Sequence, residues 1–346
     1  MTKVSIILTV YNTADYLEQA LNSLLNQTLK DIEIICINDG STDNSLAILQ
    51  KYSALDNRIK VINQSNKGIG YSRNLGISLS KGEYIAFVDS DDYVFPTTYE
   101  KAYDKAKESG NDIVIFNFEC LLEDGTELHP DVKKYFNVAS YFKNNEVSEN
   151  FNYRDIKENI LRVSWNIWNK IYKRDFINKN KIKFINTFFQ DSPFHLEAMI
   201  LAKNISFINE NLYSYRIQNP SSVTNTHYKS RKIFDFFVVA DEMKKMLLKH
   251  DKFGELERQY LEFKLVVLNS HFGAIVNEKI KKDFYLNIID SVKSEKYTIK
   301  ELRDFKFALA PDHFLYSLEF EKDFNSFGLY NSLLTKIAKL YFMIFK

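Results

Sequence analysis

The first part of the chain alternates short apolar runs with amphipathic stretches of helical period. The apolar runs predict strands, and their ranges are Val4–Val10, Ile32–Asn38, Lys60–Asn63, Tyr84–Asp89 and Asp112–Phe118. The stretches between them predict helices over Ala14–Asn26, Ser45–Tyr52 and Gly70–Ser80. Strands that are apolar throughout and are separated by helices are typical of a parallel sheet covered on both faces. The pattern therefore predicts an α/β fold for residues 1–118.

The pattern changes twice after residue 118. Residues 119–163 are polar and aromatic, and a second block of motifs runs from Ser164 to Asn225. From about Tyr228 onward, apolar residues recur at helical spacing, for example in Ile233–Leu248 and Leu261–Val276. We therefore expect three parts: an α/β core (1–118), a middle part (119–227) and a mainly helical C-terminal region (228–346).

Composition narrows the class of protein. The chain has 346 residues and a net charge of +1, which gives no electrostatic reason to expect binding to nucleic acid. The first strand begins at Val4, so we expect no signal peptide, and no apolar run is long enough to span a bilayer. Cys36 and Cys120 lie in apolar runs and are interpreted as buried thiols. We expect a cytoplasmic protein, and contact with the inner face of a membrane stays open.

Three carboxylates lie at the end of the strand Tyr84–Asp89 and just after it. Asp89, Asp91 and Asp92 repel one another unless a cation lies between them. Mg²⁺ or Mn²⁺ prefers such oxygen ligands, and the ends of strands in an open α/β sheet are where ligands bind. The alternative is a solvated acidic turn that caps the helix expected near Pro96.

Four motifs in the first hundred residues together resemble a family 2 glycosyltransferase. They are Val-Ser-Ile-Ile-Leu-Thr-Val-Tyr-Asn (4–12), Cys-Ile-Asn-Asp-Gly-Ser-Thr-Asp (36–43), Asn-Lys-Gly-Ile-Gly-Tyr-Ser-Arg-Asn-Leu-Gly (66–76) and Phe-Val-Asp-Ser-Asp-Asp (87–92). The resemblance implies the GT-A fold, a Rossmann-like, mostly parallel sheet flanked by helices. It also implies an inverting enzyme with a nucleotide-diphosphate sugar donor. The motifs fall at the ends of predicted strands, so we expect them to meet at one edge of the sheet.

The resemblance assigns donor-binding roles to the first three motifs. Thr9, Tyr11 and Asn12 leave the first strand, and Tyr11 is suited to stacking on a base. Asp39 would accept the N3–H of uracil, or stabilise its own Asn-Asp-Gly-Ser turn, or both. Arg73 would contact the diphosphate, because its planar fork fits phosphate oxygens; a surface salt bridge is the alternative.

The metal ligands follow from the same resemblance. Asp89 would contact the ribose or the metal, and Asp91 would bind the metal, Mn²⁺ or Mg²⁺. Asp92 would lie behind them. Related enzymes often supply a late histidine to the metal, which points to His227; an exposed loop histidine is the alternative.

The second block is similar to the acceptor-side half of many bacterial members of the family. It reads Ser-Trp-Asn-Ile-Trp-Asn-Lys-Ile-Tyr (164–172), Phe-Phe-Gln-Asp-Ser-Pro-Phe (188–194) and Leu-Tyr-Ser-Tyr-Arg (212–216). Those members usually carry Glu-Asp before a helix, where the Asp is the catalytic base; here the pair is Gln190-Asp191. The resemblance therefore makes Asp191 the base, and a helix N-cap is its alternative role. His195, on the helix expected after Asp191, has no sharper assignment.

Two further features have alternative interpretations. The spacing of Trp165 and Trp168 puts both on one face if the segment is helical, and we expect a core face rather than a sugar-stacking platform. In 331–346, apolar residues at helical spacing are interspersed with Lys336, Lys339 and Lys346. Such a helix can lie on an anionic membrane or dock onto the helical region or a second subunit.

Together these observations predict a metal-dependent inverting glycosyltransferase. The expected donor is a nucleotide-diphosphate sugar, UDP-linked by preference, and the expected acceptor is a glycan or lipid-linked glycan of the cell surface. The replacement of the usual Glu by Gln190 keeps one alternative open: a protein of the same fold that binds a nucleotide sugar without turnover.

Overall fold

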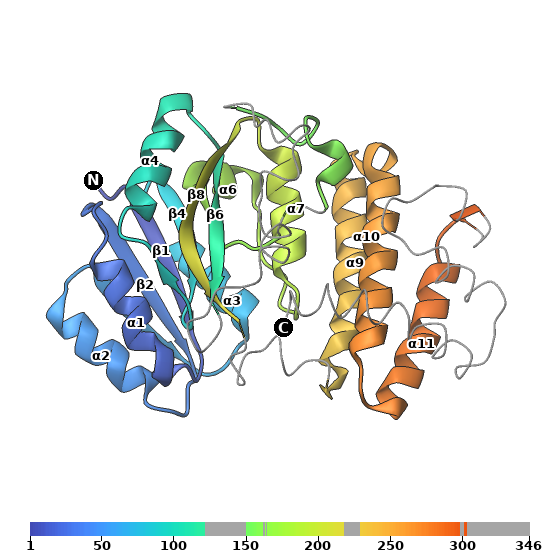
Figure 1. The fold of residues 1–346 in the computed structure, drawn as a ribbon, viewed down its shortest axis with the longest axis horizontal. Helices are drawn as coiled ribbons and strands as arrows, with labels where there is room; N and C mark the ends of the chain where they lie inside the picture. Colours follow the sequence, from blue (N-terminus) through green and yellow to red (C-terminus); the bar gives the residue numbers. More distant parts are fainter. Residues whose placement is uncertain (122–149, 162, 164, 218–228, 298–300, 303–346) are drawn as a thin grey trace. The chain divides into compact units, whose positions relative to one another are not determined.

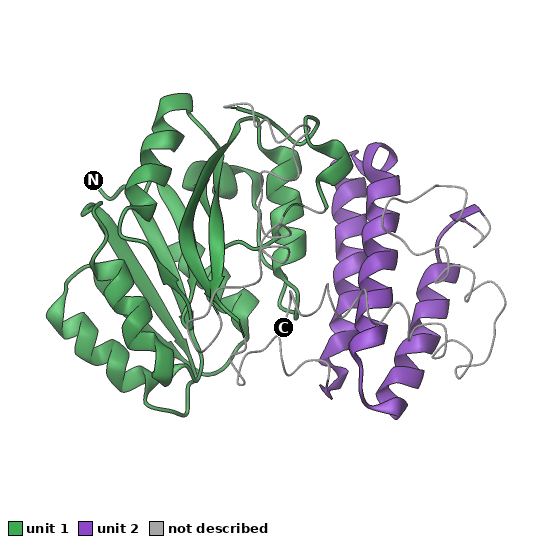
Figure 2. Ribbon diagram, viewed as in Figure 1, with its two compact units in different colours: residues 1–217 green, residues 218–346 purple. Residues whose placement is uncertain are grey.

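The chain separates into two compact units, Met1–Ile217 and Gln218–Lys346 (Figure 2). A computed structural model describes residues 1–121, 150–161, 163, 165–217, 229–297 and 301–302. His227 and the tail 331–346 lie outside the described residues. Each unit is considered by itself below.

The first unit is an alternation of strands and helices (Figure 1). In chain order its elements are β1 (Val4–Val10), α1 (Ala14–Leu25), β2 (Ile32–Asp39), α2 (Ser45–Leu55), β3 (Ile59–Gln64), α3 (Ile69–Leu79), β4 (Tyr84–Asp89), β5 (Tyr93–Val94), α4 (Thr98–Ser109), β6 (Ile113–Leu121), a 3₁₀ turn (Lys157–Asn159), β7 (Lys170–Lys173), α6 (Arg174–Asn180), α7 (Asp191–Leu201) and β8 (Ile205–Arg216).

The strands form one eight-stranded sheet in the order β3-β2-β1-β4-β7-β6-β8-β5. The pairs β2–β3, β1–β2, β1–β4 and β6–β8 are parallel, whereas β7 is antiparallel to β4 and β6, and β5 is antiparallel to β8. The predicted α/β fold with a mostly parallel sheet is confirmed. β6, β7 and β8 continue the sheet that β1 to β4 begin, so the expected core and much of the middle part share one sheet.

Both faces of the sheet are covered, as the unbroken apolar strands predict. Every residue of β1 is buried. Its alternate residues Val4, Ile6 and Leu8 belong to a core cluster with apolar residues of α1, α2 and α4. Ile7 points to the other face, where a Cβ added to Gly76 of α3 would lie 2.4 Å from it. The glycine therefore lets α3 approach β1 closely.

The segment around the two tryptophans is not helical in the described residues. Trp165 and Trp168 precede β7, which begins at Lys170. Trp168 is 4% exposed and stacks on Tyr213, with ring centroids 4.3 Å apart. The expectation of a core position is confirmed for Trp168. The condition that both tryptophans lie on one helix face does not apply, because the chain turns directly into a strand.

The described part of the second unit is helical, as expected. A 3₁₀ turn (Arg231–Phe234) precedes α9 (Asp235–Lys249), α10 (Phe253–Ala274) and α11 (Glu278–Lys293). Glu295, just after α11, accepts hydrogen bonds from Lys244 of α9 and Lys264 of α10 at 2.5 Å each. This buried ion group ties the three helices together. None of the described helices has the length and apolar character needed to cross a membrane.

Candidate functional site

The predicted donor-side residues meet at the carboxyl ends of β1, β2 and β4. Thr9 and Asp89 are register partners across the β1–β4 pair, and Val10 pairs with Asn38, next to Asp39. The convergence expected from the motif positions is therefore present. It follows from the parallel pairing of β1 with β2 and β4, which brings their three carboxyl ends to the same edge.

Tyr11 and Asn12 differ in their surroundings. Tyr11 is 48% exposed, so its ring is available for stacking. Asn12 has a positive φ of 52°, which Asn tolerates better than most residues. Its amide oxygen accepts the Thr42 backbone N–H at 2.7 Å, and its own N–H donates to Ser41 Oγ at 3.1 Å. Asn12 thus fixes the end of β1 against the loop after β2.

Asp39 is buried and holds the loop in front of α3. Its carboxylate accepts the backbone N–H groups of Lys67 at 2.8 Å and Gly68 at 2.9 Å, and the Gln64 side-chain amide at 2.8 Å. These partners lie in the 64–68 loop, not in the turn of Asp39 itself. A carboxylate has about four acceptor positions, so one remains for a donor such as the N3–H of a base.

Arg73 of α3 joins two carboxylates that come from distant parts of the chain. Its Nη2 donates to Asp89 Oδ1 at 2.8 Å, and its Nη1 donates to Asp191 Oδ1. The side chain is 3% exposed, so this is not a surface salt bridge. Burial opposes its charge, but Asp191 and Asp89 outweigh that effect, and the pKa of Arg73 is raised. The fork is thus occupied by carboxylates in the structure, whereas the sequence assigned it to phosphate.

Asp191 is the first residue of α7 and does not have the bonding of an N-cap. Gln190 occupies the N-cap position, without a side-chain capping bond, and its amide donates to Asp191 Oδ1. The Asp191 side chain keeps 26% of its surface exposed. Burial raises the pKa of Asp191 and Arg73 opposes this, while Asp89 adds to it; the net direction is upward. A partly exposed carboxylate with a raised pKa is suited to accepting a proton.

An aromatic group supports the start of α7. Phe194 stacks on Phe184 with ring centroids 3.9 Å apart, and it contacts Phe87 of β4 and Tyr172 of β7 edge to face. The segment that leads into α7 is also bonded to α3, because Asn74 exchanges two hydrogen bonds with the Phe184 backbone, at 2.8 and 2.9 Å. These contacts fix Asp191 relative to Arg73.

Two buried basic residues near Asp191, Lys170 and His195, have no role assigned from the sequence. Lys170 of β7 is fully buried and donates to Asn166 O and to Asn169 Oδ1. Burial lowers the pKa of Lys170 well below its usual value, and Asp191 opposes this. His195 lies one turn after Asp191, and neither ring nitrogen has a hydrogen-bond partner among the described residues. Burial, aided by Lys170, lowers the pKa of His195 well below its usual value.

The acidic turn after β4 contains one buried and two accessible carboxylates. Asp92 is 2% exposed, whereas Asp89 and Asp91 are partly exposed. Burial raises the pKa of Asp92 well above its usual value, and the charges of Asp91 and Asp89 add to this. The turn therefore crowds three carboxyl groups whose charged forms repel one another. Asp92 is shielded from solvent, whereas Asp89 and Asp91 remain accessible.

A metal would have to use ligands from this turn. No group of three or more His, Cys, Asp and Glu side chains is arranged to hold a metal ion in the part of the chain that the structure describes. His227, the third expected ligand, lies outside that part. Asp89 and Asp91 supply oxygen donors, the ligand type of Mg²⁺ and Mn²⁺, which usually complete their coordination with phosphate and water. The two residues present fit such an ion.

The sequence motif Leu-Tyr-Ser-Tyr-Arg was noted without a role for any of its residues. In the structure it is the end of β8, and both Tyr213 and Arg216 are hydrogen-bonded to the acidic turn. The available signal was the alternation of two tyrosines, Tyr213 and Tyr215, which is a strand pattern. It does not show which strand end the motif would contact.

Comparisons with known proteins bear on the family and the fold of this chain. The family model described as Glycosyl transferase family 2 matches residues 5–190. The uncharacterized glycosyltransferase EpsJ of Bacillus subtilis is 35% identical to this chain. The match covers 65% of this chain and 64% of the length of EpsJ. The poly(ribitol-phosphate) beta-N-acetylglucosaminyltransferase TarP of Staphylococcus aureus is 29% identical over 75% of this chain and 76% of its own.

Among solved structures, S. aureus TarS 1–349 superposes with a TM-score of 0.66 at 22% sequence identity, covering 92% of this chain and 90% of TarS 1–349. The same TarS fragment has been solved in complex with UDP and with UDP-GlcNAc. At this identity the likeness shows the fold, which is the GT-A type expected from the motifs.

Proposed function

The chain belongs to glycosyl transferase family 2, and from this premise we propose that it transfers a sugar, with inversion, from a nucleoside-diphosphate donor to an acceptor hydroxyl. The observation that carries the proposal is the position of Asp191. It lies at the end of the sheet where the donor motifs meet, joined through Arg73 to Asp89, and its pKa is raised.

Asp191 is proposed as the general base. Inversion requires a group that takes the proton from the acceptor hydroxyl while that oxygen attacks the anomeric carbon from the face opposite the leaving diphosphate. The partly exposed side chain of Asp191 can be reached by a hydroxyl. Arg73 occupies one of its oxygens, Oδ1, which leaves Oδ2 to accept the proton. Arg73 also lowers the pKa of Asp191, against the larger effect of burial.

Asp89 and Asp91 are proposed to hold a divalent cation, Mn²⁺ or Mg²⁺, with His227 as a further ligand. When bound, such an ion neutralises the charge of the diphosphate as it leaves. The crowding of Asp89, Asp91 and Asp92 supports this, because the repulsion that helps to raise the pKa of Asp92 would be relieved by a cation. The polypeptide's part is to present both carboxylates on the short turn after β4.

The donor is proposed to be a UDP-sugar. Asp39 has an acceptor position left for the N3–H of uracil, and Tyr11 presents an exposed ring for the base. Thr9 and Asn12 lie at the same strand end. TarS, which shares the fold, binds UDP and UDP-GlcNAc, and this supports the same donor class here.

The acceptor is proposed to be a glycan or lipid-linked glycan of the cell surface, at the cytoplasmic face of the membrane. The name of TarP describes transfer to poly(ribitol-phosphate), and this supports a polymer as the acceptor here. The acceptor hydroxyl would have to reach Asp191, the first residue of α7.

A donor screen tests the proposal. Purified protein is incubated with UDP-, GDP- and dTDP-sugars, with Mn²⁺, Mg²⁺ or EDTA, and released nucleoside diphosphate is measured. Turnover of at least one UDP-sugar that depends on metal supports the proposal. Tight donor binding without release of diphosphate under any condition, with or without glycan acceptors, would instead support a non-catalytic nucleotide-sugar-binding protein.

A further inference from the structure

The turn that contains Asp89 and Asp91 is hydrogen-bonded to the end of β8. The Tyr213 hydroxyl accepts the Asp89 backbone N–H at 3.3 Å and donates to Asp92 Oδ2 at 2.7 Å. The other Asp92 oxygen accepts the Arg216 backbone N–H at 2.8 Å, and Arg216 Nε donates to the Asp91 carbonyl at 3.1 Å. Between them, Tyr213 and Arg216 therefore contact all three acidic residues of the turn.

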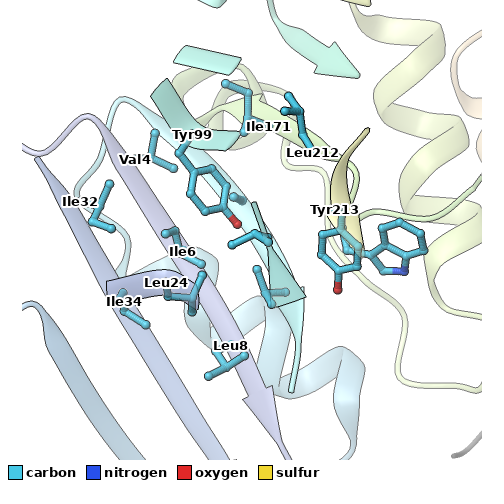
Figure 3. Packing of buried hydrophobic residues seen from close by; sticks show 14 of the residues in the cluster. Val4, Ile6, Leu8, Leu24, Ile32, Ile34, Tyr99, Ile171, Leu212 and Tyr213 are labelled. Atoms are coloured by element: carbon cyan, nitrogen blue, oxygen red, sulfur yellow. The ribbon is translucent and has the colours of Figure 1, made fainter. Parts of the chain in front are cut away.

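Tyr213 cannot easily move away from this position. Its side chain is fully buried, and its ring stacks on Trp168 at a centroid distance of 4.3 Å and an interplanar angle of 18°. Phe118 packs edge-on against Trp168, with ring centroids 4.7 Å apart. Figure 3 shows Tyr213 at one side of the buried cluster. A ring held in this way presents its hydroxyl at a fixed point.

Arg216 is held from the opposite side by α1. Its guanidinium lies over the ring of Tyr16, 4.8 Å from the centroid, and its Nη2 donates to Gln19 Oε1 at 2.6 Å. β5, which follows the acidic turn directly, pairs with β8 so that Val94 lies opposite Tyr213. The turn is thus anchored at both its ends and in its middle.

We propose that Tyr213 and Arg216 are positioning residues that hold the 89–92 turn in the shape in which Asp89 and Asp91 take a divalent cation together with the donor diphosphate. Each residue is proposed to act through its bonds to the turn. The carboxylates repel one another, so without these bonds the turn would relax to a wider arrangement that binds the ion less well. This inference rests on the proposed function.

Tyr213→Phe is the sharpest test, because it removes the hydroxyl and keeps the ring and its stacking. Tyr99→Phe is the matched control. Tyr99 is buried in the same cluster (Figure 3), and its hydroxyl has no hydrogen-bond partner among the described residues. Both variants lose one buried phenol oxygen, so a difference between them reports the two hydrogen bonds of Tyr213.

We expect Tyr213→Phe to weaken Mn²⁺ binding, measured by calorimetry in the presence of UDP, and to raise the KM for the donor. Each change should be about tenfold, the order of size expected for the loss of hydrogen bonds that hold the turn. The kcat at saturating metal and donor should stay within a fewfold of wild type, and Tyr99→Phe should match wild type in all three quantities. A merely structural loss would lower the thermal midpoint without this split between KM and kcat.

Arg216→Gln provides a second test outside the core. It removes the bond to the Asp91 carbonyl but keeps the backbone N–H that Asp92 accepts. It should shift Mn²⁺ affinity and donor KM in the same direction, and its result decides the question if Tyr213→Phe does not fold. Affinities equal to those of Tyr99→Phe in both variants would overturn the inference.

The outcome is separable from that of the proposed function. If wild-type protein binds no Mn²⁺ and turns over donor in EDTA, the proposed metal dependence fails, and the inference about the turn is overturned with it. If wild-type protein binds Mn²⁺ with UDP but transfers no sugar, only the proposed transfer fails, and the Mn²⁺ affinities of Tyr213→Phe and Tyr99→Phe still decide the inference. If wild-type protein transfers sugar with Mn²⁺ and the two variants bind Mn²⁺ equally well, only the inference is overturned.

Discussion

Arg73 and Asp191 form an ion pair between residues 118 positions apart in the chain. Arg73 comes from the helix that carries the donor-side motif, and Asp191 begins the helix on the acceptor side. The same guanidinium also bonds Asp89 at the end of β4. The proposed base is therefore held by the part of the molecule that is proposed to receive the donor.

Replacing Asp191 by Asn should abolish transfer and preserve donor binding. The amide keeps the size of the side chain but cannot take up the acceptor's proton, so kcat should fall by about a hundredfold or more. The donor dissociation constant should stay within a fewfold of wild type, measured by calorimetry with UDP. Asp175→Asn, in the first turn of α6 with a side chain 82% exposed, is the control and should be fully active. Near wild-type transfer by Asp191→Asn would exclude it as the base.

The pH dependence of kcat/KM should report the Arg73–Asp191 pair. Transfer requires the charged form of Asp191, whose pKa is raised, so the acidic limb should lie above the ordinary range of an aspartate, about 3.9. Arg73 lowers the pKa of Asp191. Arg73→Gln should therefore move the acidic limb to still higher pH.

The Arg73→Gln variant should also be less stable, by about 3–5 kcal/mol, because it leaves two carboxylates without their buried partner. Its thermal midpoint must be measured so that the pH profile is recorded on folded protein. An acidic limb that does not move, in a folded variant, would show that Arg73 does not act on the base.

Removing a proposed metal ligand should have an effect distinct from loss of the base. Asp91→Asn should lower kcat/KM by roughly a hundredfold, because charge neutralisation at the leaving diphosphate is lost. Its thermal midpoint should change little, since Asp91 is partly exposed. Asp104→Asn, at an exposed position of α4, is the control. EDTA should abolish wild-type turnover, and Mn²⁺ or Mg²⁺ should restore it; full activity in EDTA contradicts metal dependence.

The basic amphipathic segment 331–346 gives a prediction about location, although it lies outside the described residues. On the membrane hypothesis, the full chain should pellet with anionic liposomes in a salt-sensitive way, whereas a chain truncated before Asn331 should stay in the supernatant. Truncation that unfolds the protein or separates a dimer would show instead that the segment docks onto protein.

The strands of the donor side could be predicted closely from the sequence. β1 and β4 begin and end where the apolar runs do, because residues buried on both faces leave an unbroken apolar signal. β7 and β8 gave no such signal. β7 is four residues long and contains the buried Lys170, and β8 carries exposed Asn209, Glu210 and Asn211 in its middle. Pairing with distant strands, not local pattern, makes them strands.

In the site, too, some positions could be predicted from the sequence and some contacts could not. Residues at the carboxyl ends of predicted strands could be placed at one edge of the sheet from the strand pattern alone, since parallel pairing requires it. The partners of Arg73 could not be predicted, because no spacing rule connects α3 with the start of α7. The bonds from Tyr213 and Arg216 to the acidic turn depend on β8 lying next to β5, a contact between residues more than a hundred positions apart.

The sheet order also limits how such an enzyme can be rebuilt. β7 comes from the acceptor-side sequence, yet it lies between β4 and β6, which flank it from earlier in the chain. Consider a chimera that takes residues 1–118 from one parent and the following segment from another. Its β7 would have to pair with β4 and β6 of the other parent, and would meet side chains with which it does not normally pack. Exchange of acceptor preference between relatives should succeed through grafted loops and fail through swapped halves.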